Sequence, residues 1–113
     1  MITIIINEKV RLMTIVRKGN SADINNLQRI DIVNKNLLKE KLNEMLLDRD
    51  LHQIRINFNT ISKVDCTGIG LLLSFHKIIQ EMGGKLILYG IKDRSIQTIF
   101  QMIHLDRVIT IAD

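Results

Sequence analysis

The residues best suited to chemistry lie in one short run, Val64-Asp65-Cys66-Thr67-Gly68-Ile69-Gly70. It places a carboxylate, a thiol and a hydroxyl in succession, and an apolar helical pattern follows it. Backbone N–H groups at a helix N-terminus stabilise anions. A phosphoryl group on this turn would therefore be accommodated, and it would add about −1.5 to −2 charges beside Asp65. The run suits a phosphorylation switch, while simpler roles are a helix cap for Asp65 and a first-turn hydroxyl for Thr67.

Other chemistry has less support from the same residues. Gly68-Ile69-Gly70 lacks the third glycine of a dinucleotide fingerprint and the Lys-Ser/Thr of a phosphate-binding loop. The simpler interpretation is that two glycines let a strand turn sharply into a helix and leave the surface there flat. Nucleophilic catalysis by Cys66 with a histidine stays open, although nothing in the sequence supplies an oxyanion hole. A redox sensor at Cys66 also stays open, although the adjacent Asp65 opposes a thiolate.

The histidines do not form a metal-binding pattern. His52, His76 and His104 are not spaced as ligands with one another or with Cys66. We expect His52 and His76 to be solvated surface residues, and His104 to help end a helix. The expectation is therefore no metal, no cofactor and no enzymatic activity.

Composition limits the classes of protein further. The chain has 113 residues, of which 46% are hydrophobic and 25% charged, which predicts one globular domain over residues 1–113. The net charge of +4 is spread out and only 4% of residues are aromatic, so we expect no nucleic-acid binding. The single cysteine excludes an intrachain disulfide. Without a signal-peptide pattern or a long apolar run, we expect a cytoplasmic domain that does not enter a membrane.

Hydrophobic periodicity predicts the elements that must position the turn. Strands are expected at 2–6, as an additional N-terminal strand, and at 10–17, with Asn7-Glu8-Lys9 turning a hairpin between them. Residues 22–31 fit either a partly exposed strand or an irregular loop. Beyond them, helices are predicted at 35–48, 69–82 and 93–103, and strands at 54–58, 85–89 and 108–111.

Particular residues are expected to begin and end these helices. Asn34 and Asp93 are predicted N-caps, and Gly83-Gly84 ends the second helix. The apolar stripes are Leu38, Leu42, Met45 and Leu46; Leu72, Phe75, Ile79 and Met82; and Ile96, Ile99, Phe100 and Ile103. Helices alternating with strands in the second half favour parallel pairing. The predicted fold is α/β, with a central mixed sheet covered by three to four α-helices.

Several segments together, over about residues 10–113, resemble a STAS domain of the anti-sigma factor antagonist family. The run after Ile56-Asn57-Phe58 resembles the family's Asp-Ser-Ser/Thr-Gly-Leu-Gly turn. The other similar segments are Ile30-Asp31 before Leu38 and Leu42, Gly83-Gly84-Lys85-Leu86, Ile99-Phe100, and His104-Leu105-Asp106-Arg107-Val108.

The resemblance implies a non-enzymatic regulatory module whose docking surface centres on Asp65, Cys66, Thr67 and Gly68, with Asp31 beside them. The implied partner is an anti-sigma factor or a serine/threonine kinase of the histidine-kinase-like ATPase type, with a phosphatase that reverses the modification. The family's kinase phosphorylates the serine directly after the aspartate. Here Cys66 occupies that position, and Thr67 is the remaining candidate for phosphorylation.

A second hypothesis for the function predicts a larger number of subunits in the assembly. The domain could assemble with itself or with other STAS proteins in a larger signalling complex. For the antagonist hypothesis we expect a monomer or a weak homodimer.

Overall fold

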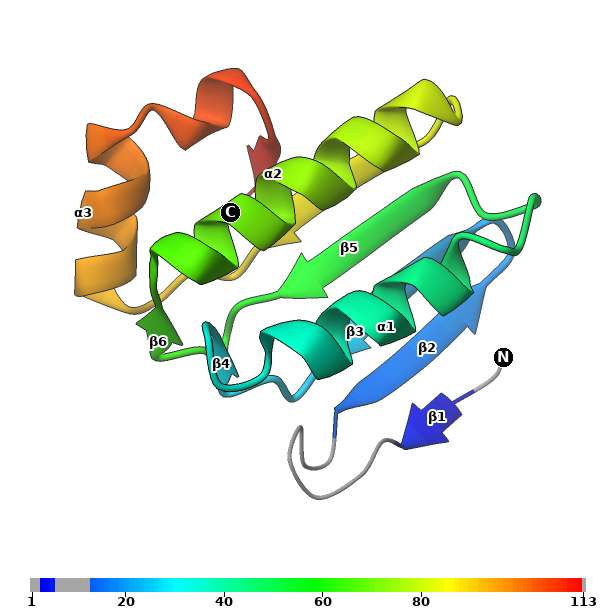
Figure 1. The fold of residues 1–113 in the computed structure, drawn as a ribbon, viewed down its shortest axis with the longest axis horizontal. Coiled ribbons are helices and arrows are strands. Elements are labelled where there is room, and N and C mark those ends of the chain that lie inside the picture. Colours follow the sequence, from blue (N-terminus) through cyan, green and yellow to red (C-terminus); the bar gives the residue numbers. More distant parts are fainter. Residues whose placement is uncertain (1–2, 6–12, 113) are drawn as a thin grey trace.

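The computed structural model describes residues 3–5 and 13–112, and within them six strands form one mixed sheet in the order β1-β2-β3-β5-β7-β8 (Figure 1). Its strands are β1 (Thr3–Ile5), β2 (Thr14–Lys18), β3 (Ser21–Asn25), β5 (Gln53–Asn57), β7 (Lys85–Tyr89) and β8 (Thr110–Ala112). The pairs β1–β2 and β2–β3 are antiparallel, whereas β3, β5, β7 and β8 run parallel. The parallel pairing predicted for the second half of the chain is confirmed.

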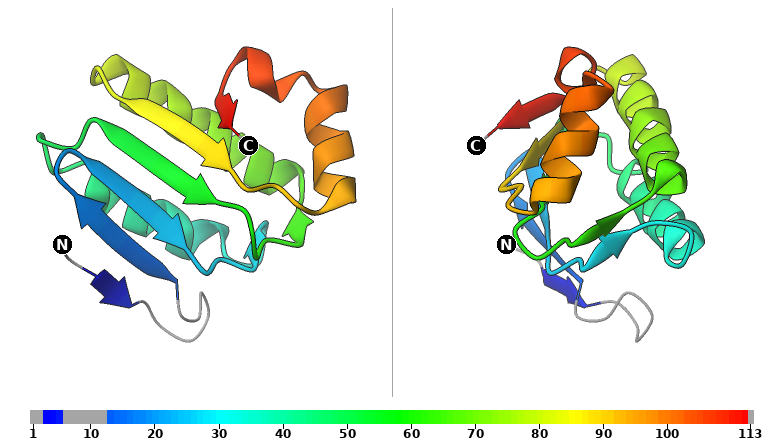
Figure 2. Two further views of the ribbon diagram at one scale, coloured as in Figure 1. Left: turned by 180° about the vertical axis from the view of Figure 1, so that it is seen from behind. Right: turned by 90° about the vertical axis from the view of Figure 1, so that its left-hand side faces the viewer.

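The helices cover one face of this sheet. In the described part of the chain they are α1 (Lys35–Met45), α2 (Cys66–Glu81), α3 (Arg94–Met102) and the short 3₁₀ helix η1 (Leu105–Arg107). Helices α1 and α2 lie side by side over the strands, and no described helix stands in front of the strands when the molecule is seen from behind (Figure 2). The predicted α/β class is confirmed, with three α-helices and one 3₁₀ helix in these residues.

The core forms where the apolar face of the sheet meets the helices. Strand alternation places two buried rows in register across β3, β5 and β7. These rows are Ala22–Ile54–Leu86 and Ile24–Ile56–Leu88. The helices contribute Leu38 and Leu42 from α1, Leu72, Phe75 and Ile79 from α2, and Ile96 and Phe100 from α3, all of them buried.

The opposite face of the sheet is polar and carries its own network. Tyr89 Oη donates a hydrogen bond to Asp23 Oδ2 at 3.2 Å, and the Arg55 guanidinium carbon lies 4.5 Å from the centroid of the Tyr89 ring. Partial burial, reinforced by the charge of Asp23, raises the pKa of the Tyr89 phenol. This face is therefore stabilised by polar and cation–π contacts between neighbouring strands.

Of the two alternatives for residues 22–31, a partly exposed strand is confirmed for the first part. β3 lies between β2 and β5, with Ala22 and Ile24 buried and the alternate residues only half-buried. The chain turns at Asn26, whose φ of 66° lies in the left-handed region. It then forms β4 (Arg29–Ile30), a two-residue strand too short to show a sequence period.

Several predicted boundaries and buried positions need correction. α1 ends at Met45, and the last strand begins at Thr110 because η1 occupies the residues before it. Met82 and Ile103, placed on buried stripes, are exposed because each lies at the C-cap of its helix. Ile99 is half-buried. The predicted strand at 2–6 overlaps β1, while the turn at residues 7–9 and the start of the strand at 10–17 fall outside the described residues.

Candidate functional site

Two very short strands bring the two aspartates of the predicted site to the same place. β4 pairs in parallel with β6 (Lys63–Val64), in the register Arg29↔Lys63 and Ile30↔Val64. Because the strands are parallel, Asp31 and Asp65 follow them at the same end. The Ile32 N–H donates a hydrogen bond to Asp65 Oδ2 at 3.1 Å, which joins the two loops. The expected position of Asp31 beside the turn is therefore found in the structure.

Asp65 is the N-cap of α2. Its Oδ1 accepts a hydrogen bond from the Gly68 N–H at 2.8 Å, while Oδ2 accepts the bond from Ile32. This satisfies one of the free N–H groups of the first helical turn and ties it to the loop after β4. α2 consequently begins at Cys66 rather than near Ile69, and both glycines of the run lie inside the helix.

Asp31 is buried and its carboxylate is held by Arg29. Arg29 Nε donates to both carboxylate oxygens at 3.0 and 2.8 Å, and the Val33 N–H donates to Oδ1 at 3.1 Å. The hydrogen bonds from Arg29, and next those from backbone N–H groups, hold the pKa of Asp31 below its ordinary value, against the opposing effect of burial. Asp31 therefore fixes the shape of the loop between β4 and α1.

Asn34 completes this loop in a way that the sequence did not indicate. Its Oδ1 accepts from the Asp31 N–H at 3.1 Å, and its Nδ2 donates to the Arg29 carbonyl at 2.6 Å. Asn34 occupies the N-cap position of α1 but makes no side-chain capping bond. The predicted N-cap position is confirmed, but the side chain does not cap the helix, because both of its polar atoms bond to the loop before α1.

Gly68 is required for the close approach of α2 to β4. A Cβ atom added at this buried residue would lie 1.8 Å from the Ile30 carbonyl oxygen. Gly70, one residue beyond Ile69, would meet nothing within 4 Å. The sequence suggested that the two glycines let a strand turn sharply into a helix, but both lie within α2. Gly68 allows helix and strand backbones to touch, and Gly70 leaves an opening beside the helix.

The surface around Asp65 includes apolar side chains that the sequence reasoning missed. Ile32 and Val33 are 66% and 61% exposed, next to the loop that bonds Asp65. Cys66 is exposed and Thr67 is half-buried. The predicted residues Asp65, Cys66, Thr67 and Gly68 are thus together, with two exposed apolar residues beside them. The available signal in the sequence was the apolar pair Ile32-Val33, which lies just before the predicted helix and outside its apolar stripe.

A groove runs between α1 and α2 next to Thr67. It has a volume of about 350 Å³ and is lined by Lys35, Lys39, Thr67, Gly70, Leu71 and Ser74. The open space at Gly70 contributes to it, because a larger side chain there would fill part of the groove. We call this feature the α1–α2 groove.

Comparison with known families decides what kind of domain this is. The family model of the STAS domain matches residues 23–113. The chain belongs to the STAS domain family. The match covers the helices, the whole Asp65 turn and, apart from the first two residues of β3, the parallel strands. It confirms the family that the sequence motifs indicated.

Solved structures share this STAS fold at low sequence identity. The anti-sigma factor antagonist SpoIIAA in its unphosphorylated form is 18% identical, with a TM-score of 0.67 over 87% of this chain and 84% of that one. The phosphorylated form of SpoIIAA, a Bacillus cell fate determinant, is 19% identical, with a TM-score of 0.68 over 89% and 91%. The Thermotoga maritima protein TM1081 is 18% identical, with a TM-score of 0.75 over 89% of this chain and 86% of that one.

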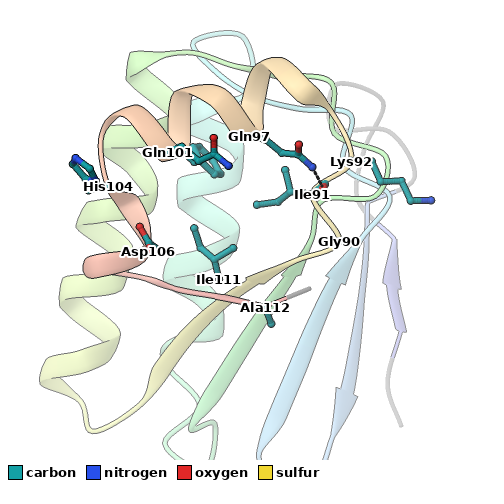
Figure 3. A pocket seen from close by; sticks show the side chains of 10 residues that line it. Gly90, Ile91, Lys92, Gln97, Gln101, His104, Asp106, Ile111 and Ala112 are labelled. Carbon is teal, nitrogen blue, oxygen red and sulfur yellow. Dashed lines mark hydrogen bonds between the residues drawn. The ribbon is translucent and has the colours of Figure 1, made fainter.

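A larger hollow of this STAS domain involves none of the predicted site residues. It has a volume of about 750 Å³ and lies between α3, η1 and β8 (Figure 3). Gln97 Nε2 already donates to the Ile91 carbonyl at 2.8 Å, and Lys92 points away from the other lining side chains (Figure 3). Gln101, His104 and Asp106 also line this hollow, which is separate from the Asp65 turn and not part of the candidate site.

The histidines of the STAS domain are dispersed. His52 is exposed, and His104 ends α3 in the left-handed conformation with a φ of 55°, as its predicted role requires. His76 is half-buried, with Nδ1 buried and without a hydrogen-bond partner, so the expectation of a solvated histidine is wrong there. Within residues 3–5 and 13–112, no three His, Cys, Asp or Glu side chains gather as a metal site would need. No described helix has the length and apolar character needed to cross a bilayer.

Proposed function

We propose that this STAS domain is a non-enzymatic regulatory module that binds an anti-sigma factor through the surface around the Asp65–Gly68 turn. The proposed partner is an anti-sigma factor or serine/threonine kinase of the histidine-kinase-like ATPase type. The observation that carries the proposal is the bond from the Ile32 N–H to Asp65 Oδ2. It unites the turn with the exposed pair Ile32 and Val33, in a chain whose fold resembles that of the antagonist SpoIIAA.

Each residue has a stated role in this proposal. Cys66, Ile32 and Val33 supply exposed contact area, and an exposed apolar cluster beside polar groups is typical of an interaction surface. Asp65 and Asp31 hold the two loops in place, and Gly68 permits their close packing. The partner would therefore meet a surface that is already formed before binding, which lowers the entropy cost of association.

Regulation is assigned to Thr67 in the same proposal. Cys66 occupies the position of the family's acceptor serine and carries no hydroxyl, so Thr67 is the proposed phosphorylated residue. A phosphatase would restore the binding-competent form. The domain would act in the cytoplasm, where a single free cysteine stays reduced, and as a monomer or weak homodimer, which light scattering would measure.

A negative charge on Thr67 tests the docking surface. The immobilised domain is used to capture its partner from an extract of the source cells, and mass spectrometry identifies it. Titration calorimetry with the purified partner then compares the wild type with Thr67→Glu. We expect at least a tenfold loss of affinity, about 1.4 kcal/mol, because the new carboxylate would lose its hydration and repel acidic groups of the partner in the interface.

Thr98→Glu serves as the matched control, since Thr98 is exposed on α3, away from the turn. It adds the same charge and should leave affinity unchanged. Equal affinity for the wild type and Thr67→Glu, with both proteins folded, would place the interface elsewhere on the domain. Capture of no ATPase of this type would reject the proposed partner.

A further inference from the structure

Two lysines that line the α1–α2 groove give it a positive charge. Lys35 and Lys39 lie four residues apart on α1, hence on the same face of the helix. Neither forms an ion pair with any residue in the described ranges. The remaining residues that line the groove are uncharged: Thr67, Gly70, Leu71 and Ser74.

The orientation of the helices adds to this positive potential. α1 and α2 both begin at the end of the molecule where β4 and β6 lie (Figure 1), and the first turn of each contains no acidic residue. The N-terminal end of a helix carries a partial positive charge, so Lys35 at the first position of α1 is unfavourable for the helix itself. The nearest carboxylate in the turn, Asp65, is bonded to the N–H groups of Gly68 and Ile32.

We propose that the α1–α2 groove receives an acidic segment of the partner protein, with a glutamate or aspartate side chain between Lys35 and Lys39. This rests on the proposed function, because it extends the docking surface from the Asp65 turn along α1. A volume of about 350 Å³ is at the lower limit of ligand cavities and suits a few side chains of a larger surface. The exposed Ile32 and Val33 precede Lys35 directly and offer the same segment an apolar contact.

The position of Thr67 in the groove gives this proposal a consequence for regulation. Thr67 lines the groove together with both lysines. A negative group on Thr67 would attract Lys35 and Lys39 and repel an acidic segment from the same space. The loss of affinity expected for Thr67→Glu then has a physical cause, namely competition for two lysines.

The test uses the full chain labelled with ¹⁵N and a capped peptide of alternating glutamate and leucine residues as the probe. In titrations at low salt followed by NMR, we expect shifts of the amide signals of Lys35, Lys39, Thr67 and Ser74. Raising the salt concentration should reverse them, because the attraction is electrostatic. A peptide with lysine in place of glutamate should leave these signals unmoved.

Charge reversal gives the matched comparison. Lys35→Glu/Lys39→Glu should weaken peptide binding at least tenfold. Lys85→Glu/Lys92→Glu changes the net charge equally at exposed sites outside the groove and should bind like the wild type. The amide spectra of both variants report whether they are folded. Shifts scattered over the surface, or an equal loss in both double variants, would overturn the proposal.

The purified partner separates this proposal from the proposed function. If Thr67→Glu lowers the affinity for the partner while Lys35→Glu/Lys39→Glu binds the partner with wild-type affinity, docking at the Asp65–Gly68 turn is supported and the acidic-segment proposal is overturned. If no anti-sigma factor binds but the glutamate peptide still shifts the groove residues, the proposed function fails, and the groove is a site for an acidic segment of a partner of another class.

Discussion

α2 can pack closely against β4 because Gly68 carries a hydrogen atom where any other residue has a Cβ atom. The position of an added Cβ, 1.8 Å from the Ile30 oxygen, cannot be relieved by a flexible side chain, because the atom it meets belongs to the backbone. Gly68, which was predicted as part of the docking surface, therefore has a structural role in the packing of α2 against β4.

Alanine substitutions at the two glycines of α2 should have opposite effects. Gly68→Ala is expected to lower the free energy of unfolding by about 1–3 kcal/mol, because it overpacks a buried contact. Gly70→Ala should raise it by roughly 0.5–1 kcal/mol, because its site is open and alanine favours the helix. Urea denaturation of both variants measures the difference. A similar change in the two would contradict the close approach of α2 to β4.

Cys66 determines whether the residue after the cap can accept a phosphoryl group. It is exposed, so access does not prevent modification, and a thiol in place of a hydroxyl is the relevant difference. When the partner kinase and ATP are added, Cys66→Ser should be phosphorylated on residue 66, as peptide mass spectrometry would show, with Cys66→Ala as the matched control. In the same assay the wild type should carry phosphate on Thr67, as the proposed regulation requires. Absence of phosphate in every variant would leave a binding module without this switch.

At the scale of elements, the loop from β4 to α1 is held by a compact polar network. Arg29, Asp31 and Asn34 bond to one another and to the loop backbone, and the loop in turn donates to Asp65. The loop therefore presents Ile32 and Val33 in a fixed conformation even though both side chains are exposed. The Asp31 carboxylate is buried, and the partly exposed Arg29 and the Val33 N–H supply its hydrogen bonds, so the cost of burying its charge is offset.

The lowered pKa of Asp31 predicts how this loop responds to acid. Its stabilising contribution is complete above the pKa of an aspartate in the unfolded chain and is lost as pH falls from about 4 through the lowered folded-state value. Asp31→Asn should therefore be less stable than the wild type at neutral pH, and the difference should shrink in acid. Urea unfolding at several pH values measures it, with Asp106→Asn at an exposed site as control. A difference that stays constant down to the most acidic pH would contradict the assignment to Arg29 and Asp31.

At the scale of the whole molecule, the one-sided covering of the sheet creates the candidate site. With α1 and α2 on the same face, their N-termini come together at the end where β4 and β6 pair. Asp31 and Asp65, distant in the sequence, become neighbours there, and the α1–α2 groove forms beside them. The polar network of Asp23, Arg55 and Tyr89 keeps the other face of the sheet suited to solvent.

The local features of this protein could be predicted from its residues alone. Alternating apolar residues located β5 and β7, the stripe through Leu72, Phe75 and Ile79 located α2, and Asp93 was a correct cap. The order of its motifs identified the family, which the match over residues 23–113 confirms. These features were accessible because period, capping and turn chemistry depend on residues close together along the chain.

Which of these elements contact one another follows from the three-dimensional packing and could not be predicted from the residues. The pairing of β4 with β6 has no sequence period, because each strand contains two residues. Asn34 had the right residue type for a cap, but Arg29 and Asp31 offered its side chain other partners. Met82 and Ile103 matched the apolar stripes, yet no other element covers the ends of their helices. The α1–α2 groove likewise depends on two helices packed side by side. The spacing of residues along the chain does not predict that packing.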